Sequence, residues 1–167
     1  MRLSTRVAAL CVGLFVSHHG AAAELPQRWV SAGGALSEWV SALGGESKLV
    51  GVDTTSQHPG SLKALPSIGY QRQLSAEGIL SLRPQLLIGT EEMGPPPVLA
   101  QIRNAGVQVE LFSAQPDLPA LQVNLQHLGE LLGAEDQAAQ AYQRYQAQLD
   151  QQKIRVTKAQ LTQQSPG

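Results

Sequence analysis

The sequence predicts an α/β fold built on a parallel sheet and followed by helix alone. Two observations support this prediction. Short apolar segments alternate with segments of helical spacing as far as residue 112, which is typical of parallel strands joined by right-handed helical crossovers. After Pro119 only helical spacing remains. We therefore expect an α/β lobe at residues 24–134 and a long helix at 135–162.

The first 23 residues have the pattern of a secretory signal peptide. Arg2 and Arg6 give a basic start, residues 7–16 are an uncharged apolar run, and residues 21–23 supply small side chains for cleavage. That run is too short for a permanent membrane span, which needs roughly 20 apolar residues. Cleavage would remove the only cysteine, so we expect an exported protein with neither a disulfide nor a thiolate metal site.

Composition limits the remaining possibilities. The chain has 167 residues, with 12 Lys and Arg against 13 Asp and Glu and a pI near 6.4. This balance predicts no basic surface for nucleic acid. A hydrophobic fraction of 43% with only 4% aromatic residues predicts a single aliphatic core.

Strands are expected where short apolar segments end at polar or glycine-rich sequence. These segments are residues 28–32, 48–52, 86–88 and 107–112. Helices are expected where apolar residues recur with helical spacing or where capping signals stand. These segments are residues 36–43, 76–82, 98–104, 121–133 and 135–161.

Start and stop signals bound several of these helices. A glycine pair at 44–45 ends the first, and Ser75 is placed to cap the second, which Pro84 ends. Three prolines at 95–97 introduce the third helix, and Gly106 closes it. The last helix would extend roughly 40 Å at 1.5 Å per residue, more than a lobe of this size needs for its own cover. We therefore expect this helix to project from the lobe toward another structural element.

A polar loop follows the second predicted strand. Residues 53–60 read D-T-T-S-Q-H-P-G, and open α/β folds bind ligands at the carboxyl ends of their strands. Thr54, Thr55 and Ser56 either donate hydrogen bonds to a ligand or cap the following turn. His58 either serves as a ligand or lies in solvent.

Three segments together carry a family resemblance. They read S-A-G-G-A-L-S-E-W-V-S-A-L-G-G, K-L-V-G-V-D and A-E-G-I-L-S-L-R-P-Q-L-L-I. With this order of elements, the mature chain resembles the N-terminal lobe of class III periplasmic binding proteins, which serve ABC importers of cobalamin, iron-siderophores and haem. The segments D-T-T-S-x-x-P and L-P-S-I-G-Y-Q-R-Q-L-S-A-E-G look most like the haem-binding branch.

The resemblance implies a role for two residues. The branch's haem ligand is a tyrosine followed two residues later by an arginine, which fall on Tyr70 and Arg72. A phenolate oxygen is a hard donor suited to ferric haem, and a guanidinium can donate a charge-assisted hydrogen bond to it. On extended backbone, this spacing directs both side chains to one side. Without the resemblance, the pair would read as a packed tyrosine and a solvated arginine.

The same resemblance implies further contacts. His58 would be a second iron ligand or approach a haem propionate. Glu77 would present a carboxylate to the importer's membrane permease, although its place in the first turn of a helix is also explained by the helix dipole. In the family a second lobe follows the long helix, so residues 163–167 are expected to be a truncated tail.

We therefore expect a carrier that captures ferric haem in the periplasm and delivers it to an ABC permease. The alternatives are a siderophore or cobalamin carrier of the same fold, and a truncated lobe that only docks to the permease. An enzyme is not expected, because the glycines of S-A-G-G-A lack the dinucleotide-binding spacing and no phosphate loop G-x-x-x-x-G-K is present.

Overall fold

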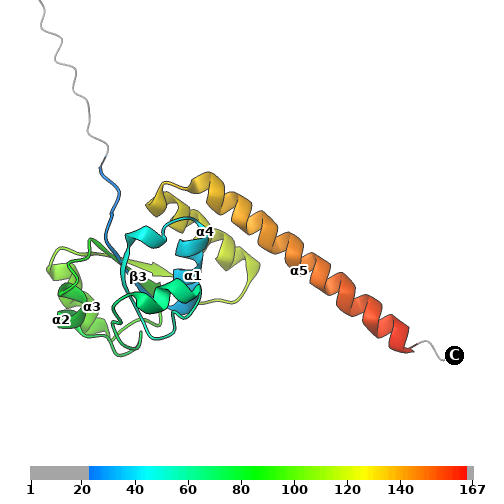
Figure 1. Ribbon diagram of the computed structural model, residues 1–167, viewed down its shortest axis with the longest axis horizontal. Coiled ribbons are helices and arrows are strands. Elements are labelled where there is room, and N and C mark those ends of the chain that lie inside the picture. The colour runs from blue at the N-terminus through cyan, green and yellow to red at the C-terminus, as the bar shows by residue number, and fades with distance from the viewer. Residues whose placement is uncertain (1–22, 165–167) are drawn as a thin grey trace, which may run out of the picture.

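The computed structural model describes residues 23–164, so all but the last residue of the predicted signal peptide lies outside it, as do residues 165–167 of the predicted tail (Figure 1). Four parallel strands form the central sheet. They are β1 Trp29–Ala32, β2 Leu49–Val52, β3 Leu86–Thr90 and β4 Gln108–Phe112. The sheet order is β2-β1-β3-β4. The α/β class and the parallel sheet predicted from the sequence are confirmed.

Helices connect and cover these strands. They are α1 Gly34–Ala42, α2 Ala76–Leu80, α3 Pro96–Asn104, α4 Leu118–Leu132 and α5 Glu135–Gln164, with short 3-10 helices η1 Glu46–Lys48 and η2 Gly60–Ala64. Each matches a helix expected from sequence, apart from the 3-10 helices. The observed α1 begins two residues earlier than predicted because Gly33, with a φ of 137°, reverses the chain directly after β1.

The core has two layers, one on each face of the sheet. Alternating side chains of β3 point to opposite faces, as a strand requires: Leu86 and Ile88 join the cluster under α1, α4 and the start of α5, whereas Leu87 joins the cluster under α2 and α3. Figure 1 shows α2 and α3 on one side of β3 and α1 and α4 on the other. The sheet is therefore covered on both faces.

The long helix α5 divides into a packed part and a projecting part. Near its start, Ala138 and Ala141 are buried against α4. Every residue from 150 to 162 is exposed, and the helix runs away from the lobe in Figure 1. No helix within residues 23–164 combines the length and apolar character that a membrane span needs.

Candidate functional site

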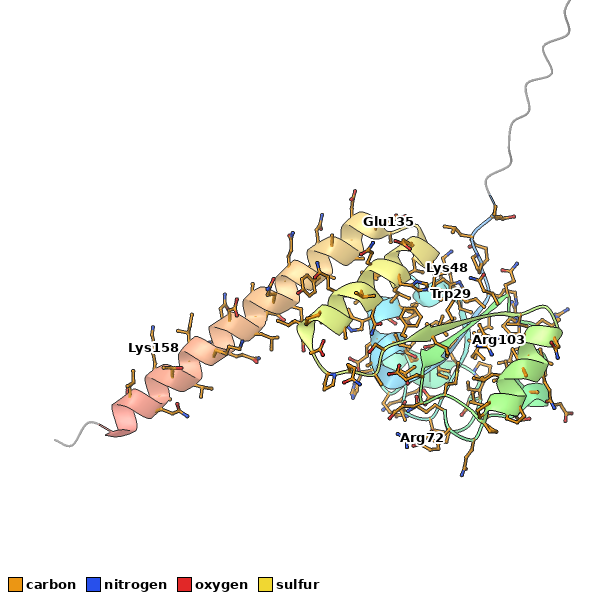
Figure 2. All side chains as sticks on the ribbon, turned by 180° about the vertical axis from the view of Figure 1, so that it is seen from behind. Trp29, Lys48, Arg72, Arg103, Glu135 and Lys158 are labelled. Atoms are coloured by element: carbon orange, nitrogen blue, oxygen red, sulfur yellow. The ribbon has the colours of Figure 1, made fainter. Side chains whose placement is uncertain are left out.

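All four strands end at one edge of the sheet, and the loops that follow them gather there. The residues that directly follow β1 to β4 are Gly33, Asp53, Glu91 and Ser113. Figure 2 shows Arg72 on the side of the lobe away from Trp29 and Lys48, which mark the amino ends of β1 and β2. Because β1 lies between β2 and β3, successive connections diverge here, which is where open α/β sheets bind ligands.

A buried carboxylate forms the base of this edge. Asp53 is 2% exposed. One of its oxygens, Oδ1, accepts hydrogen bonds from the backbone N–H of Gly33 at 3.0 Å and from the Ser56 hydroxyl at 2.9 Å. The other, Oδ2, accepts from the Thr55 hydroxyl at 2.8 Å. Both oxygens of this buried group are therefore satisfied, and they fasten the loop after β1 to the loop after β2.

A row of buried serines extends this base into α1. The Ser37 hydroxyl oxygen lies 2.8 Å from that of Ser31 and 2.7 Å from that of Ser56. All three side chains are buried. Strand β1, helix α1 and the loop after β2 are thus joined by side-chain hydrogen bonds as well as by apolar packing.

The three hydroxyl residues predicted as ligand donors have different surroundings. Ser56 faces the interior, where its hydroxyl bonds the side chains of Asp53 and Ser37. The Thr55 hydroxyl donates to Asp53 and also accepts from Gly34 N–H at 2.8 Å. Thr54 is exposed. Of the three, Thr54 is the hydroxyl most available to a ligand.

The segment that carries Tyr70 is a turn, not the extended backbone that the sequence predicts. Gln73 N–H donates to the Tyr70 carbonyl at 2.9 Å and closes this turn. Two further backbone hydrogen bonds hold the turn to the loop after β3. Gly94 N–H donates to the Gln71 carbonyl, and Leu74 N–H donates to the Gly94 carbonyl, both at 2.9 Å. The extended backbone expected for this segment is not observed, and the two bonds that hold the turn to Gly94 span 20 or more positions of the chain, which local sequence does not indicate.

The turn also meets the loop after β2. The carbonyl of Gly69 accepts from Thr54 N–H at 3.0 Å, and Gly69 has a φ of 84°, a conformation that favours glycine. Tyr70 follows directly and is 41% exposed. The Tyr70 side chain is therefore accessible, while the backbone of its turn is hydrogen-bonded to the loops after β2 and β3.

Arg72, two residues after Tyr70, is paired with Glu92. Its Nη2 atom lies 2.8 Å from Glu92 Oε1, and the two side chains are 53% and 44% exposed. Glu92 raises the pKa of the Arg72 guanidinium, first by the hydrogen bond and then by its charge, and the charge of an ionised Tyr70 acts in the same direction. Tyr70 and Arg72 thus stand two positions apart in one turn at the ligand-binding edge.

Glu92 was not predicted from the sequence as part of this site. Its position shortly after β3, beside Glu91, placed two carboxylates at the ligand-binding edge. Glu91 faces elsewhere, accepting a hydrogen bond from Ala114 N–H at 2.9 Å. The sequence does not distinguish the two glutamates. The folded loop shows that Glu92 pairs with Arg72 and that Glu91 bonds the loop after β4.

Within residues 23–164, neither His58 nor Glu77 is joined to Tyr70 or Arg72 by a hydrogen bond or ion pair. His58 is exposed. Glu77 is exposed in the first turn of α2, where Ser75 caps the helix by accepting from Gly78 N–H at 3.3 Å. The predicted cap at Ser75 is confirmed.

An apolar cavity of about 420 Å³ opens beside the same edge, between α1, the loop after β4, α4 and the middle of α5. Trp39, Leu121, Tyr145 and Leu149 contribute to its walls. Trp39 and Tyr145 meet edge to face, with ring centroids 5.9 Å apart. Tyr70 does not line this cavity.

Solved structures of periplasmic haem-binding proteins are similar to this fold. One from Pseudomonas aeruginosa is 65% identical, with a TM-score of 0.82 over 86% of this chain and 51% of that protein. The haem-binding protein HutB of Vibrio cholerae is 40% identical, with a TM-score of 0.70 over 74% of this chain and 48% of that one. Both similarities confirm the fold of a periplasmic binding protein lobe.

One sequence relative is named for a ligand other than haem. The vitamin B12-binding protein of Pectobacterium atrosepticum is 28% identical over 131 residues, which are 77% of this chain and 46% of that protein. The chain thus spans about half the length of the relatives it matches. The sequence profile of the periplasmic binding protein family matches residues 30–166. Because this match covers most of the chain, the protein belongs to the periplasmic binding protein family.

Proposed function

We propose that this chain is the first lobe and linker helix of a periplasmic carrier that captures ferric haem for an ABC importer. The observation that carries the proposal is the 65% identity, over 86% of the chain, to a periplasmic haem-binding protein. An exposed tyrosine beside a guanidinium, at the ligand-binding edge, supports it chemically.

Tyr70 is the proposed iron ligand. Its phenol is accessible, and its turn is bonded to the loops after β2 and β3. A phenolate oxygen matches the hardness of ferric iron, and a neighbouring guanidinium stabilises the charged form of the phenol. In this proposal Tyr70 binds the iron, Arg72 stabilises the phenolate, and Thr54 is the remaining hydroxyl for a propionate.

The test is a hemin titration of the wild-type chain and of Tyr70→Phe. Binding through Tyr70 should give the wild type a shifted Soret band and a ferric-tyrosinate charge-transfer band, and the variant should lose the second. The chain contains three tyrosines, so Tyr145→Phe is a matched control: Tyr145 is 37% exposed and packs on Trp39. An unchanged spectrum in Tyr70→Phe would refute the ligand assignment.

His58 is a candidate second ligand or propionate contact, since it is exposed in the loop after β2. Replacing it with alanine should change the ligand-field bands of the haem complex if the imidazole binds iron. Unaltered bands and affinity would assign His58 to solvent.

A cobalamin carrier is the second candidate, favoured by the likeness to a vitamin B12-binding protein. The same edge would then face a corrinoid, and Tyr70 would not be required as a metal ligand. Parallel titrations with hemin, cyanocobalamin and a ferric siderophore separate these candidates. Saturable binding of cyanocobalamin but not hemin would replace the haem proposal.

Glu77 is the proposed contact to the membrane permease. Its carboxylate is exposed, and its helix start is already capped by Ser75. Glu77→Gln should therefore weaken capture by the detergent-solubilised permease while haem binding is kept. Equal capture of both forms would leave Glu77 with its helix-dipole role alone. Capture of the wild type without any haem binding would favour a lobe that only docks.

A further inference from the structure

We propose that Glu92 is a positioning residue for the ligand site: its carboxylate holds the guanidinium of Arg72 beside the phenol of Tyr70. This inference rests on the proposed function, because the geometry matters only if Tyr70 binds the ligand. Its starting observation is the pair itself, in which Arg72 Nη2 lies 2.8 Å from Glu92 Oε1.

Arg72 needs such a partner because its position is otherwise poorly constrained. Its side chain is 53% exposed, and a free arginine samples many rotamers that must be restricted before it can serve a fixed neighbour. Within residues 23–164, Glu92 is the partner whose carboxylate the guanidinium meets. Pairing therefore reduces the rotamers of Arg72 before the ligand arrives.

Glu92 is suited to this task because its own loop is held at several points. Its N–H donates to the Thr90 hydroxyl at 3.3 Å, and Met93 N–H donates to the Thr90 carbonyl at 2.9 Å. Two residues on, Gly94 bonds Gln71, which lies in the turn between Tyr70 and Arg72. The loop that carries Glu92 and the turn that carries Tyr70 are thus held together by the backbone bond between Gly94 and Gln71.

The pair leaves Arg72 able to act on Tyr70. A guanidinium carries five N–H donors in a planar fork, and the bond to Glu92 uses one of its nitrogens. The other donors have no hydrogen-bond partner within residues 23–164. Glu92 thus restrains the guanidinium and leaves its other N–H donors unpaired.

The neighbouring glutamate supplies a matched control. Glu91 stands in the same loop and carries the same charge, but it accepts from Ala114 N–H instead of pairing with Arg72. A glutamine at either position removes one negative charge and keeps an oxygen acceptor. Any difference between Glu92→Gln and Glu91→Gln is therefore specific to the contact with Arg72.

The experiment measures hemin affinity and the ferric-tyrosinate band for the full chain carrying Glu92→Gln, Glu91→Gln, Arg72→Ala and the double change Glu92→Gln with Arg72→Ala. We expect Glu92→Gln to weaken hemin binding about two- to fivefold, the range of an exposed ion pair, and to shift the band. Glu91→Gln should do neither. In the Arg72→Ala background, Glu92→Gln should have no further effect, because the group it positions is absent.

Two results would overturn the inference while leaving the proposed function intact. One is wild-type affinity and band in Glu92→Gln, although Tyr70→Phe still loses the band. The other is an equal effect of Glu92→Gln with and without Arg72, which would mean that its charge acts on the ligand directly. If the wild type binds no hemin, the proposed function and this inference are both rejected. Urea unfolding of each variant checks that the folded population is unchanged.

Discussion

The base and the rim of the ligand-binding edge are built in different ways. At the base, Asp53 is 2% exposed and both of its oxygens accept hydrogen bonds. At the rim, the Arg72 and Glu92 side chains are about half exposed and form a single ion pair. Burial makes each polar contact at the base important for stability, whereas solvent at the rim makes its contacts weak. Substitutions at Arg72 and Glu92 should therefore change the stability of the lobe less than a substitution at Asp53.

The largest expected effect belongs to the base. Asp53→Ala removes the acceptor for Gly33 N–H, Ser56 and Thr55, and leaves the buried Gly33 N–H without its hydrogen-bond partner. We expect the free energy of unfolding to fall by about 3 kcal/mol. Urea denaturation followed by circular dichroism measures this change.

Asp117→Ala is the control for that variant. Asp117 is exposed and caps α4 by accepting from Ala120 N–H at 2.8 Å. Losing an exposed cap should cost about 1 kcal/mol. Equal losses for the two aspartates would contradict the distinction between buried and exposed polar contacts.

A smaller effect is expected at the serine row. Ser37→Ala removes the hydroxyl that lies between Ser31 and Ser56 and should lower the free energy of unfolding by about 1 kcal/mol. Helix α1 offers a matched control, because the buried Ser41 hydroxyl has no hydrogen-bond partner. Ser41→Ala should therefore be neutral or stabilising. A comparable loss at both serines would mean that helix packing, not the hydrogen bonds, sets the cost.

The sequence predicts most of the frame of this edge. Apolar runs that end at polar or glycine-rich sequence located every strand, and the Ser75 cap located the start of α2. Helices α1, α3 and α4 begin two or three residues before their predicted starts. The α5 helix follows from its long unbroken helical pattern. These features depend on residues close together in the chain, so periodicity and capping are sufficient to find them.

The details of the site could not be predicted in the same way. The turn at Tyr70 is fixed by Gly94, and the orientation of Arg72 depends on Glu92. Ser56 stands in a polar loop that reads as exposed, yet its hydroxyl is buried against Asp53 and Ser37. Each feature depends on contacts between distant segments, which local patterns do not contain.

The smallest expected effect on stability belongs to the rim. Tyr70 is 41% exposed, and Arg72 makes its ion pair in solvent, so Tyr70→Phe and Arg72→Ala should each change the free energy of unfolding by no more than about 0.5 kcal/mol. Urea denaturation without ligand measures this directly. A loss as large as that of Asp53→Ala would make the rim part of the folded core, and any effect of these variants on hemin binding would then follow from unfolding. Unchanged stability with lost binding would instead separate the two regions, because the base would hold the fold while the rim contacts the ligand.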